Sequence, residues 1–204
     1  MVPYIDNDTI FHKANDFLCK YHVSFDCPIP IDLIAEKNLG LIIFPITNLE
    51  RYCEVHGGIS KDFKTILVDE KQYMNQECRT RFTIAHEIGH LILHSGLFSE
   101  ISKVSTNKEY IDFQNHISID DHRKLEIQAN FFAEEVLFPK DVFRETVEKI
   151  IGELGGIDKL LPTDLFLVMS TLEKSFGVTG IAAYNKFKRD YPEVLDRVLV
   201  NSPF

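Results

Sequence analysis

Cysteine is scarce in this chain of 204 residues. Its four cysteines are Cys19, Cys27, Cys53 and Cys78, and no two of them form a C-x-x-C pair. This scarcity argues against a cysteine zinc knuckle and against a disulfide framework. We therefore expect free thiols, as in a reducing cytoplasm.

Long apolar runs are also missing. No run approaches the roughly 18 residues that a membrane-spanning helix requires. Residues 1–11 carry Asp6 and Asp8, and they lack the cationic start and the apolar stretch of a signal peptide. These absences predict a cytoplasmic protein that does not bind a membrane.

Positive charge is in deficit, since 22 lysines and arginines face 31 aspartates and glutamates, for a formal net charge of −9. This balance argues against a broad nucleic-acid-binding face and against an anionic membrane surface as partner. It suits an enzyme, or a protein that attracts a basic partner. The hydrophobic content of 45% and the charged content of 26% are ordinary for a soluble globular protein.

Apolar patterning predicts an α+β protein with one domain over residues 1–204. Within it, residues 1–96 form an α/β part with a small sheet and a central helix, 97–122 a loop, and 123–204 a mostly helical part. Loops as long as 97–122 are often functional lids or binding loops. Branched apolar runs predict strands at 41–46, 57–60 and 65–69. Helical spacing predicts further helices that follow Asp6 and that cover 123–139, 141–154, 163–176, 179–191 and 192–200.

The central helix contains an H-E-x-x-H motif within RFTIAHEIGHLILH, residues 81–94. Because four residues make about one helical turn, His86 and His90 share a face, about 6 Å apart along the axis. Two imidazoles at that spacing can bind one tetrahedral zinc ion. Glu87 points about 100° away from His86, where a carboxylate can take a proton from a water that the metal activates. The motif predicts a zinc hydrolase, although it also arises by chance in core helices.

Gly89 lies inside this helix, where glycine costs about 1 kcal/mol relative to alanine. Its presence predicts that another segment passes close to the helix at this point. The helix that carries a further metal ligand and a bound substrate are both candidates.

A catalytic zinc usually has three protein ligands and one water, and His94 is the first candidate for the third ligand. It continues the i, i+4 series, but it lies about 12 Å from His86 along a straight helix. Three side chains spread over that length cannot all reach one metal ion. We therefore expect a structural or supporting role for His94.

Other candidates for the third ligand follow the central helix. His116 and His122 lie in or beside the predicted loop, and either can instead bind substrate. Asp120 and Asp121 are better explained as helix caps.

Glu126 is the strongest candidate. It shares a helix face with Asn130, and the small Ala129 would let this helix approach the central helix near Gly89. Asn130 could then hydrogen-bond a ligating histidine and fix the orientation of its ring. From the residues alone, an exposed glutamate on a solvated face explains Glu126 equally well.

Two of these segments resemble motifs of one known family. Residues 81–94 resemble the signature of the ImmA/IrrE metallopeptidase family, and EIQANFFAEE at 126–135, with LFP at 137–139, resembles its second motif. Shorter flanking likenesses extend the match roughly from Pro28 to Lys188. They lie at residues 30–36, 57–60 and 176–179.

This resemblance implies a zincin-like fold in which His86, His90 and Glu126 hold one zinc ion per chain and Glu87 is the general base. Family members characteristically act on helix-turn-helix repressors. The resemblance therefore implies a zinc-dependent endopeptidase that hydrolyses a peptide bond in such a regulatory protein. The alternative is an anti-repressor that binds its partner without cutting it and uses zinc for structure. The same ligands also accept manganese or iron.

The chain departs from the family pattern in two places. The segment between the motifs, 95–125, is longer than expected, so we expect it to alter substrate choice or to cover the site. Residues 180–184 lack the arginine-leucine ending expected there, which puts substrate binding by that end in question. The donor that stabilises the developing oxyanion has four candidates: Tyr110, His116, His122 and Tyr184.

Overall fold

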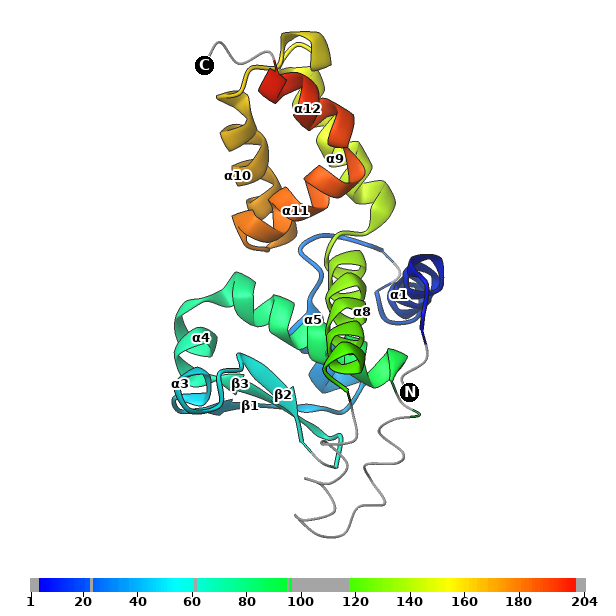
Figure 1. Ribbon diagram of the computed structural model, residues 1–204, viewed down its shortest axis with the longest axis vertical. Helices are drawn as coiled ribbons and strands as arrows, with labels where there is room; N and C mark the ends of the chain where they lie inside the picture. Colours follow the sequence, from blue (N-terminus) through cyan, green and yellow to red (C-terminus); the bar gives the residue numbers. More distant parts are fainter. Residues whose placement is uncertain (1–3, 23, 61, 95, 97–117, 201–204) are drawn as a thin grey trace.

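The computed structural model describes residues 4–22, 24–60, 62–94, 96 and 118–200. A small sheet with short helices lies at one end of the molecule and the C-terminal helices lie at the other, with long helices between them (Figure 1). This arrangement confirms the α+β prediction, including a mostly helical part towards the C-terminus.

The three predicted strands form one mixed sheet. They are β1 (Ile42–Ile46), β2 (Gly57–Ile59) and β3 (Thr65–Asp69). The central strand β3 pairs in parallel with β1 and antiparallel with β2. Ile66 and Val68 of β3 are fully buried, and the long helix α5 (Glu77–Leu93) contacts β2 and β3. The sheet therefore supports the helix that carries the H-E-x-x-H motif.

The helices largely follow the predicted segments. Those before residue 97 are α1 (Asn7–Tyr21), α2 (Ile31–Leu33), the π-helix η1 (Ile34–Asn38), α3 (Leu49–Cys53), α4 (Glu70–Asn75) and α5. Those after residue 117 are α8 (Ile119–Leu137), α9 (Lys140–Glu153), the 3-10 helix η2 (Ile157–Lys159), α10 (Asp164–Phe176), α11 (Gly180–Asp190) and α12 (Pro192–Val200). The short helices α3 and α4 were not predicted, because helices of 5 and 6 residues contain too few turns to show a period.

The predicted loop over 97–122 is wrong at its end, because residues 119–122 form the first turn of α8. Its remaining part, 97–117, lies outside the described residues. Ser118 caps α8, since its side-chain oxygen accepts a hydrogen bond from the backbone N–H of Asp121 at 3.0 Å. Asp120 and Asp121 are therefore not the caps that the sequence suggested. They lie in the first turn of α8, where negatively charged side chains interact favourably with the helix dipole.

The contact between α5 and α8 brings the two family-like motifs together. At Gly89 a Cβ atom would lie 3.1 Å from the carbonyl oxygen of Ala129 and 3.2 Å from its Cα. The same atom would lie 3.2 Å from Cδ1 of Phe132. The backbone of α8 therefore passes directly over Gly89. This confirms the close approach of the two helices that Gly89 and Ala129 predicted.

Gly89→Ala is expected to lower the free energy of unfolding by about 1–2 kcal/mol, because the added methyl group must push α8 away from α5. Gly152→Ala is the matched control. Gly152 is an exposed helical residue of α9, and a Cβ atom there meets nothing within 4 Å. Gly152→Ala should raise the free energy of unfolding by about 0.5–1 kcal/mol, because alanine has a higher helix propensity than glycine. Urea unfolding of both variants measures the difference, and equal gains would contradict this account of Gly89.

Buried apolar side chains form one continuous core from α1 to α12. Phe17 of α1 contacts Phe132 of α8 with ring centroids 5.8 Å apart. The buried Arg81 of α5 ties the N-terminal connector to the helical part, because it donates to the carbonyl oxygens of Ile29 and Gly177 at 2.5 and 2.9 Å. The contacts of Arg81 thus fix α5 against the N-terminal connector and against the turn between α10 and α11.

Among the described residues, no single helix has the length and apolar character needed to cross a membrane. Within the same residues, one pair of helices, α10 and α11, meets the length and composition requirement when taken together, and the two are bent by 109° to each other.

Candidate metal centre

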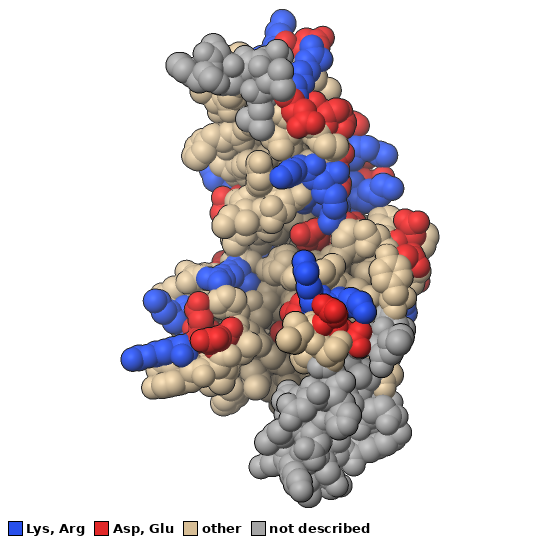
Figure 2. All heavy atoms as spheres, in the orientation of Figure 1, with Lys and Arg blue, Asp and Glu red and all other residues tan. Residues whose placement is uncertain are grey.

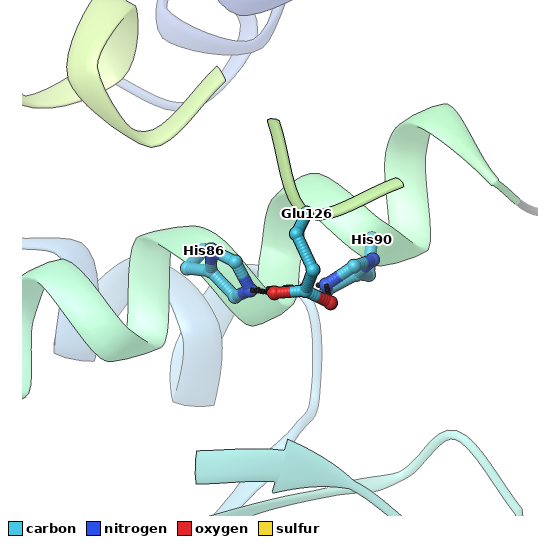
Figure 3. Close-up of side chains that lie close together, drawn as sticks. All are labelled: His86, His90 and Glu126. Carbon is cyan, nitrogen blue, oxygen red and sulfur yellow. Dashed lines mark hydrogen bonds and ion pairs between the residues drawn. The ribbon is translucent and has the colours of Figure 1, made fainter. Parts of the chain in front are cut away.

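Three metal-binding side chains converge between α5 and α8. His86 and His90 lie one turn apart on α5, and Glu126 reaches them from the first half of α8 (Figure 3). The carboxylate oxygens of Glu126 lie 3.2 Å from Nε2 of His86 and 3.3 Å from Nε2 of His90. The two Nε2 atoms are 3.0 Å apart. The structure thus brings together the three residues named as zinc ligands from the sequence.

Asn130 determines which nitrogen of His86 carries a hydrogen. Its side-chain oxygen lies 2.9 Å from Nδ1 of His86. Because this oxygen can only accept, Nδ1 carries the hydrogen and Nε2 presents its lone pair to Glu126. The predicted hydrogen bond between Asn130 and one of these histidines is confirmed, with Asn130 as the acceptor.

A chain of two hydrogen bonds orients His90 in the same way. Nε2 of His94 lies 2.9 Å from the side-chain oxygen of Gln128, so it donates there and leaves Nδ1 of His94 as an acceptor. Nδ1 of His90 lies 3.1 Å from that acceptor and donates to it. Nε2 of His90 therefore also presents a lone pair to Glu126.

His94 has the supporting position that the sequence suggested. Burial lowers the pKa of His94 to about 4, which keeps the ring neutral, as the hydrogen-bond chain requires. Gln128 was missed. The sequence feature that could have identified Gln128 is its position on the apolar face of α8. It lies three positions after Leu125 and four before Phe132, and its side chain is buried.

These donors fit a zinc ion. Two nitrogen lone pairs and a carboxylate facing one another at 3.0–3.3 Å repel unless a cation lies between them. Ligands 2.0–2.1 Å from a tetrahedral zinc are separated by about 3.3 Å. The observed separations match that value, and two imidazoles with one carboxylate are a common ligand set of catalytic zinc.

Glu87 lies beside the three donors in a cavity of about 570 Å³. Burial raises the pKa of Glu87 above its ordinary value, and the side chain is only 7% exposed. The cavity is lined by His86, Glu87, His90, Glu126 and Asn130 together with Glu54, Val55, His56, Gly57, Gly58, Phe82, Thr83 and His122. A carboxylate in this position can exchange protons with a molecule held at the metal.

Of the four candidates for the oxyanion donor, only His122 lines this cavity within the described part of the chain. Tyr184 lies on α11, away from the cavity lining. Tyr110 and His116 lie outside the described residues. His56, in the loop before β2, also lines the cavity.

Gly57→Ala is expected to destabilise the wall that faces Glu87. The new Cβ atom would lie 2.3 Å from Cγ2 of Thr83, and Thr83 is held because its hydroxyl accepts from Gln72 at 2.9 Å. We expect a loss of about 1–3 kcal/mol in the free energy of unfolding. Gly58→Ala adds the same methyl group to the next residue of β2, where nothing lies within 4 Å. Thermal unfolding should separate the two variants, and equal midpoints would refute the close packing at Gly57.

His94→Ala is expected to weaken zinc binding by about 10–100-fold without removing a ligand, because His90 loses the acceptor that orients its ring. Competition with a chromophoric chelator measures the affinity. His12→Ala, a change of the same kind on α1 far along the chain from the site, serves as the control. Zinc affinity that is identical in His94→Ala and the unmodified protein would contradict the orienting role of His94.

The model of the family described as Peptidase_M78, IrrE N-terminal-like domain, matches residues 47–188. This range contains all residues of the metal centre and Glu87. Among solved structures, the chain is similar to a Mycobacterium tuberculosis transcriptional regulator, with a TM-score of 0.56 and 16% identity. The alignment covers 91% of this chain and 56% of the regulator, so the chain spans about half of that protein's length. This likeness shows a shared fold. The comparison with curated proteins found no match to the sequence of this chain.

Proposed function

Because this chain belongs to the peptidase family of IrrE N-terminal-like domains, we propose that it is a zinc-dependent endopeptidase that hydrolyses a peptide bond in a regulatory protein. Membership confirms the family resemblance of the two motifs and the zincin-like α+β fold expected from it. The observation that carries the proposal is the buried carboxylate of Glu87 beside three converging metal-binding groups. A structural metal site has no use for such a base.

His86, His90 and Glu126 would hold the ion, one per chain. A zinc ion bound there would polarise the carbonyl group of the substrate and lower the pKa of a water molecule. Glu87 would accept a proton from that water as it attacks the carbonyl carbon, and would then donate the proton to the leaving amine. The raised pKa of Glu87 makes it a stronger proton acceptor than an exposed glutamate. Asn130 and His94 would hold the two imidazole rings in place.

The sheet offers a place for the substrate backbone. β2 is the last strand of the described sheet on its side, since the order is β1-β3-β2. Gly57 and Gly58 of β2 line the metal-site cavity, and a Cβ atom at Gly58 would meet nothing within 4 Å. An extended peptide can pair with such an edge through main-chain hydrogen bonds. This supports an unfolded or extended segment of a protein as substrate.

A helix-turn-helix repressor is the proposed substrate. The family resemblance suggests this class, and a net charge of −9 favours approach of a basic DNA-binding protein. We propose that the encounter takes place in the cytoplasm and involves no direct contact of this chain with nucleic acid or membrane.

Co-incubation with a helix-turn-helix repressor, chosen from the reading frames that neighbour the gene for this chain, tests this function. The zinc-loaded protein should convert the repressor into one discrete pair of fragments, and a chelator should abolish this cleavage. Zinc added after chelation should restore it. A repressor that binds and stays full-length in the presence of zinc would instead favour the non-cleaving anti-repressor.

A further inference from the structure

A second cavity adjoins the metal-site cavity. It has a volume of about 830 Å³ and lies between the N-terminal half of α5, the middle of α8 and the start of α11. Phe82 and Asn130 line both cavities, so the two lie side by side and share a wall. On the face drawn in Figure 2, uncharged residues lie where the helical part meets the sheet-bearing part, with charged residues beside them. We call this second cavity the α11 pocket.

We propose that the α11 pocket selects the substrate by taking a large apolar side chain from the peptide that is cut at the metal centre. The proposal rests on the proposed function, and it adds the residue class that the site prefers near the scissile bond. Ligand-binding pockets commonly combine apolar surface with a few polar groups that orient the ligand.

Apolar side chains of α5 and α11 form part of the walls, and polar side chains, mainly of α5, α8 and α11, form the rest. The charged residues among them are Glu77, Arg79 and Glu134. Phe82 of α5 lies between the pocket and the metal centre, and Ile181 and Ala182 begin α11 on the opposite side. Ile181 is 76% exposed, although it is a large aliphatic residue. A substrate side chain seated against Phe82 and Ile181 would remove this apolar surface from water. Asn185 adds an amide that can hydrogen-bond the peptide backbone.

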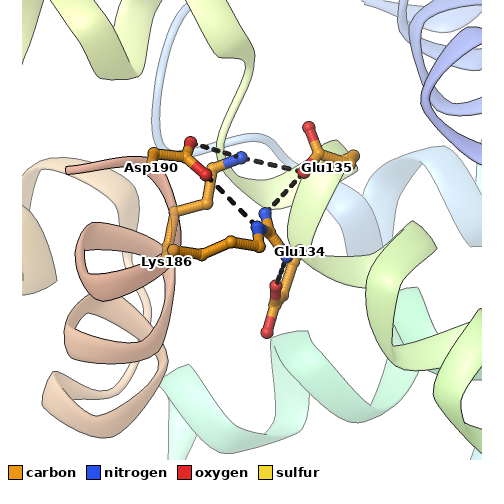
Figure 4. Close-up of polar contacts among 5 residues, drawn as sticks. Glu134, Glu135, Lys186 and Asp190 are labelled. Carbon is orange, nitrogen blue, oxygen red and sulfur yellow. Dashed lines mark hydrogen bonds and ion pairs between the residues drawn. The ribbon is translucent and has the colours of Figure 1, made fainter. Parts of the chain in front are cut away.

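Ion pairs hold α11 against α8, so the walls are fixed before a substrate arrives (Figure 4). Lys186 of α11 is 2% exposed and donates to Glu135 of α8 at 2.8 Å. Arg189 donates to Glu135 at 2.6 Å and also pairs with Glu134, which itself lines the pocket. Glu134 follows Asn130 by one turn on α8. The helix that holds the metal ligand thus also anchors the pocket wall.

The test is a cleavage profile on a peptide library of mixed sequence, with the zinc-loaded protein and two variants. Ile181→Glu places a charge in the pocket, and the first turn of α11 accepts an acidic residue because of the helix dipole. Phe166→Glu is the control, since Phe166 is 82% exposed on α10 and lines neither cavity.

The unmodified protein should prefer leucine, methionine or phenylalanine at one position near the cut. Ile181→Glu should lower kcat/KM on those peptides by at least about tenfold and shift the preference towards lysine and arginine. Phe166→Glu should leave the profile unchanged. Cleavage with the same profile in all three proteins would overturn the proposed role of the α11 pocket in substrate selection while leaving the peptidase function intact.

Binding provides a second measurement that needs no turnover. Zinc-loaded Glu87→Gln would be titrated with two peptide hydroxamates that differ only in a leucine or a glycine side chain. The leucine compound should bind at least about tenfold more tightly, and Ile181→Glu in the same background should remove the preference. Equal affinities, or no binding, would overturn the proposal. Selective binding without any cleavage by the unmodified protein would instead count against the peptidase function alone.

Discussion

Glu87→Gln is expected to lower kcat/KM for repressor cleavage by about 10²–10⁴-fold while zinc stays bound, because general acid–base catalysis contributes that much to the rate. The amide has the shape of the carboxylate, but it cannot accept the proton of the attacking water. Glu87 is not among the three converging ligands, so the metal should remain. Gel assays give the rate, and elemental analysis gives the zinc content.

Glu153→Gln makes the same chemical change at an exposed position of α9 and should leave both rate and zinc content unchanged. Zinc retention together with full cleavage by Glu87→Gln would show that another group is the base. Relief of repression by Glu87→Gln with a full-length partner would favour the non-cleaving anti-repressor.

Glu126→Ala is expected to weaken zinc binding by about two to three orders of magnitude. Zinc with four ligands is bound by about 10–16 kcal/mol in small sites, so each ligand contributes a few kcal/mol. The loss would follow from the geometry, since Glu126 is the only group that α8 contributes to the described cluster. Competition with a chromophoric chelator at pH 7 measures the affinity of the variant and of the unmodified protein.

His122→Ala is the matched control for Glu126→Ala. His122 was also a candidate for the third ligand, and it lines the same cavity, but it is not part of the converging group. It should leave zinc affinity nearly unchanged. Tight zinc binding in Glu126→Ala combined with loss in His122→Ala would reverse the assignment of the third ligand.

Local spacing predicted the parts of the site that lie on one helix. His86 and His90 are one turn apart, so their shared face follows from helical geometry alone. Gly89 and Ala129 predicted the close approach of α5 and α8, because only small residues allow two backbones to come so near. The convergence of Glu126 with the histidines then follows from that helix crossing. Its ligand role stays a prediction.

Other features depend on packing that no local pattern reveals. The chain from His90 through His94 to Gln128 joins residues that are 34 positions apart at its second hydrogen bond. The helices α3 and α4 are too short to show a period, and the first turn of α8 was hidden among polar residues that resemble a loop. The α11 pocket was missed for a similar reason, since its walls come from three helices distant in the chain.

Crystals grown with zinc and measured on both sides of the zinc absorption edge test the central claim most directly. We predict one anomalous peak per chain, placed between Nε2 of His86, Nε2 of His90 and the carboxylate of Glu126, with each ligand atom about 2.0–2.2 Å away. A peak held by other residues, or no peak at this position in zinc-saturated crystals, would contradict the account.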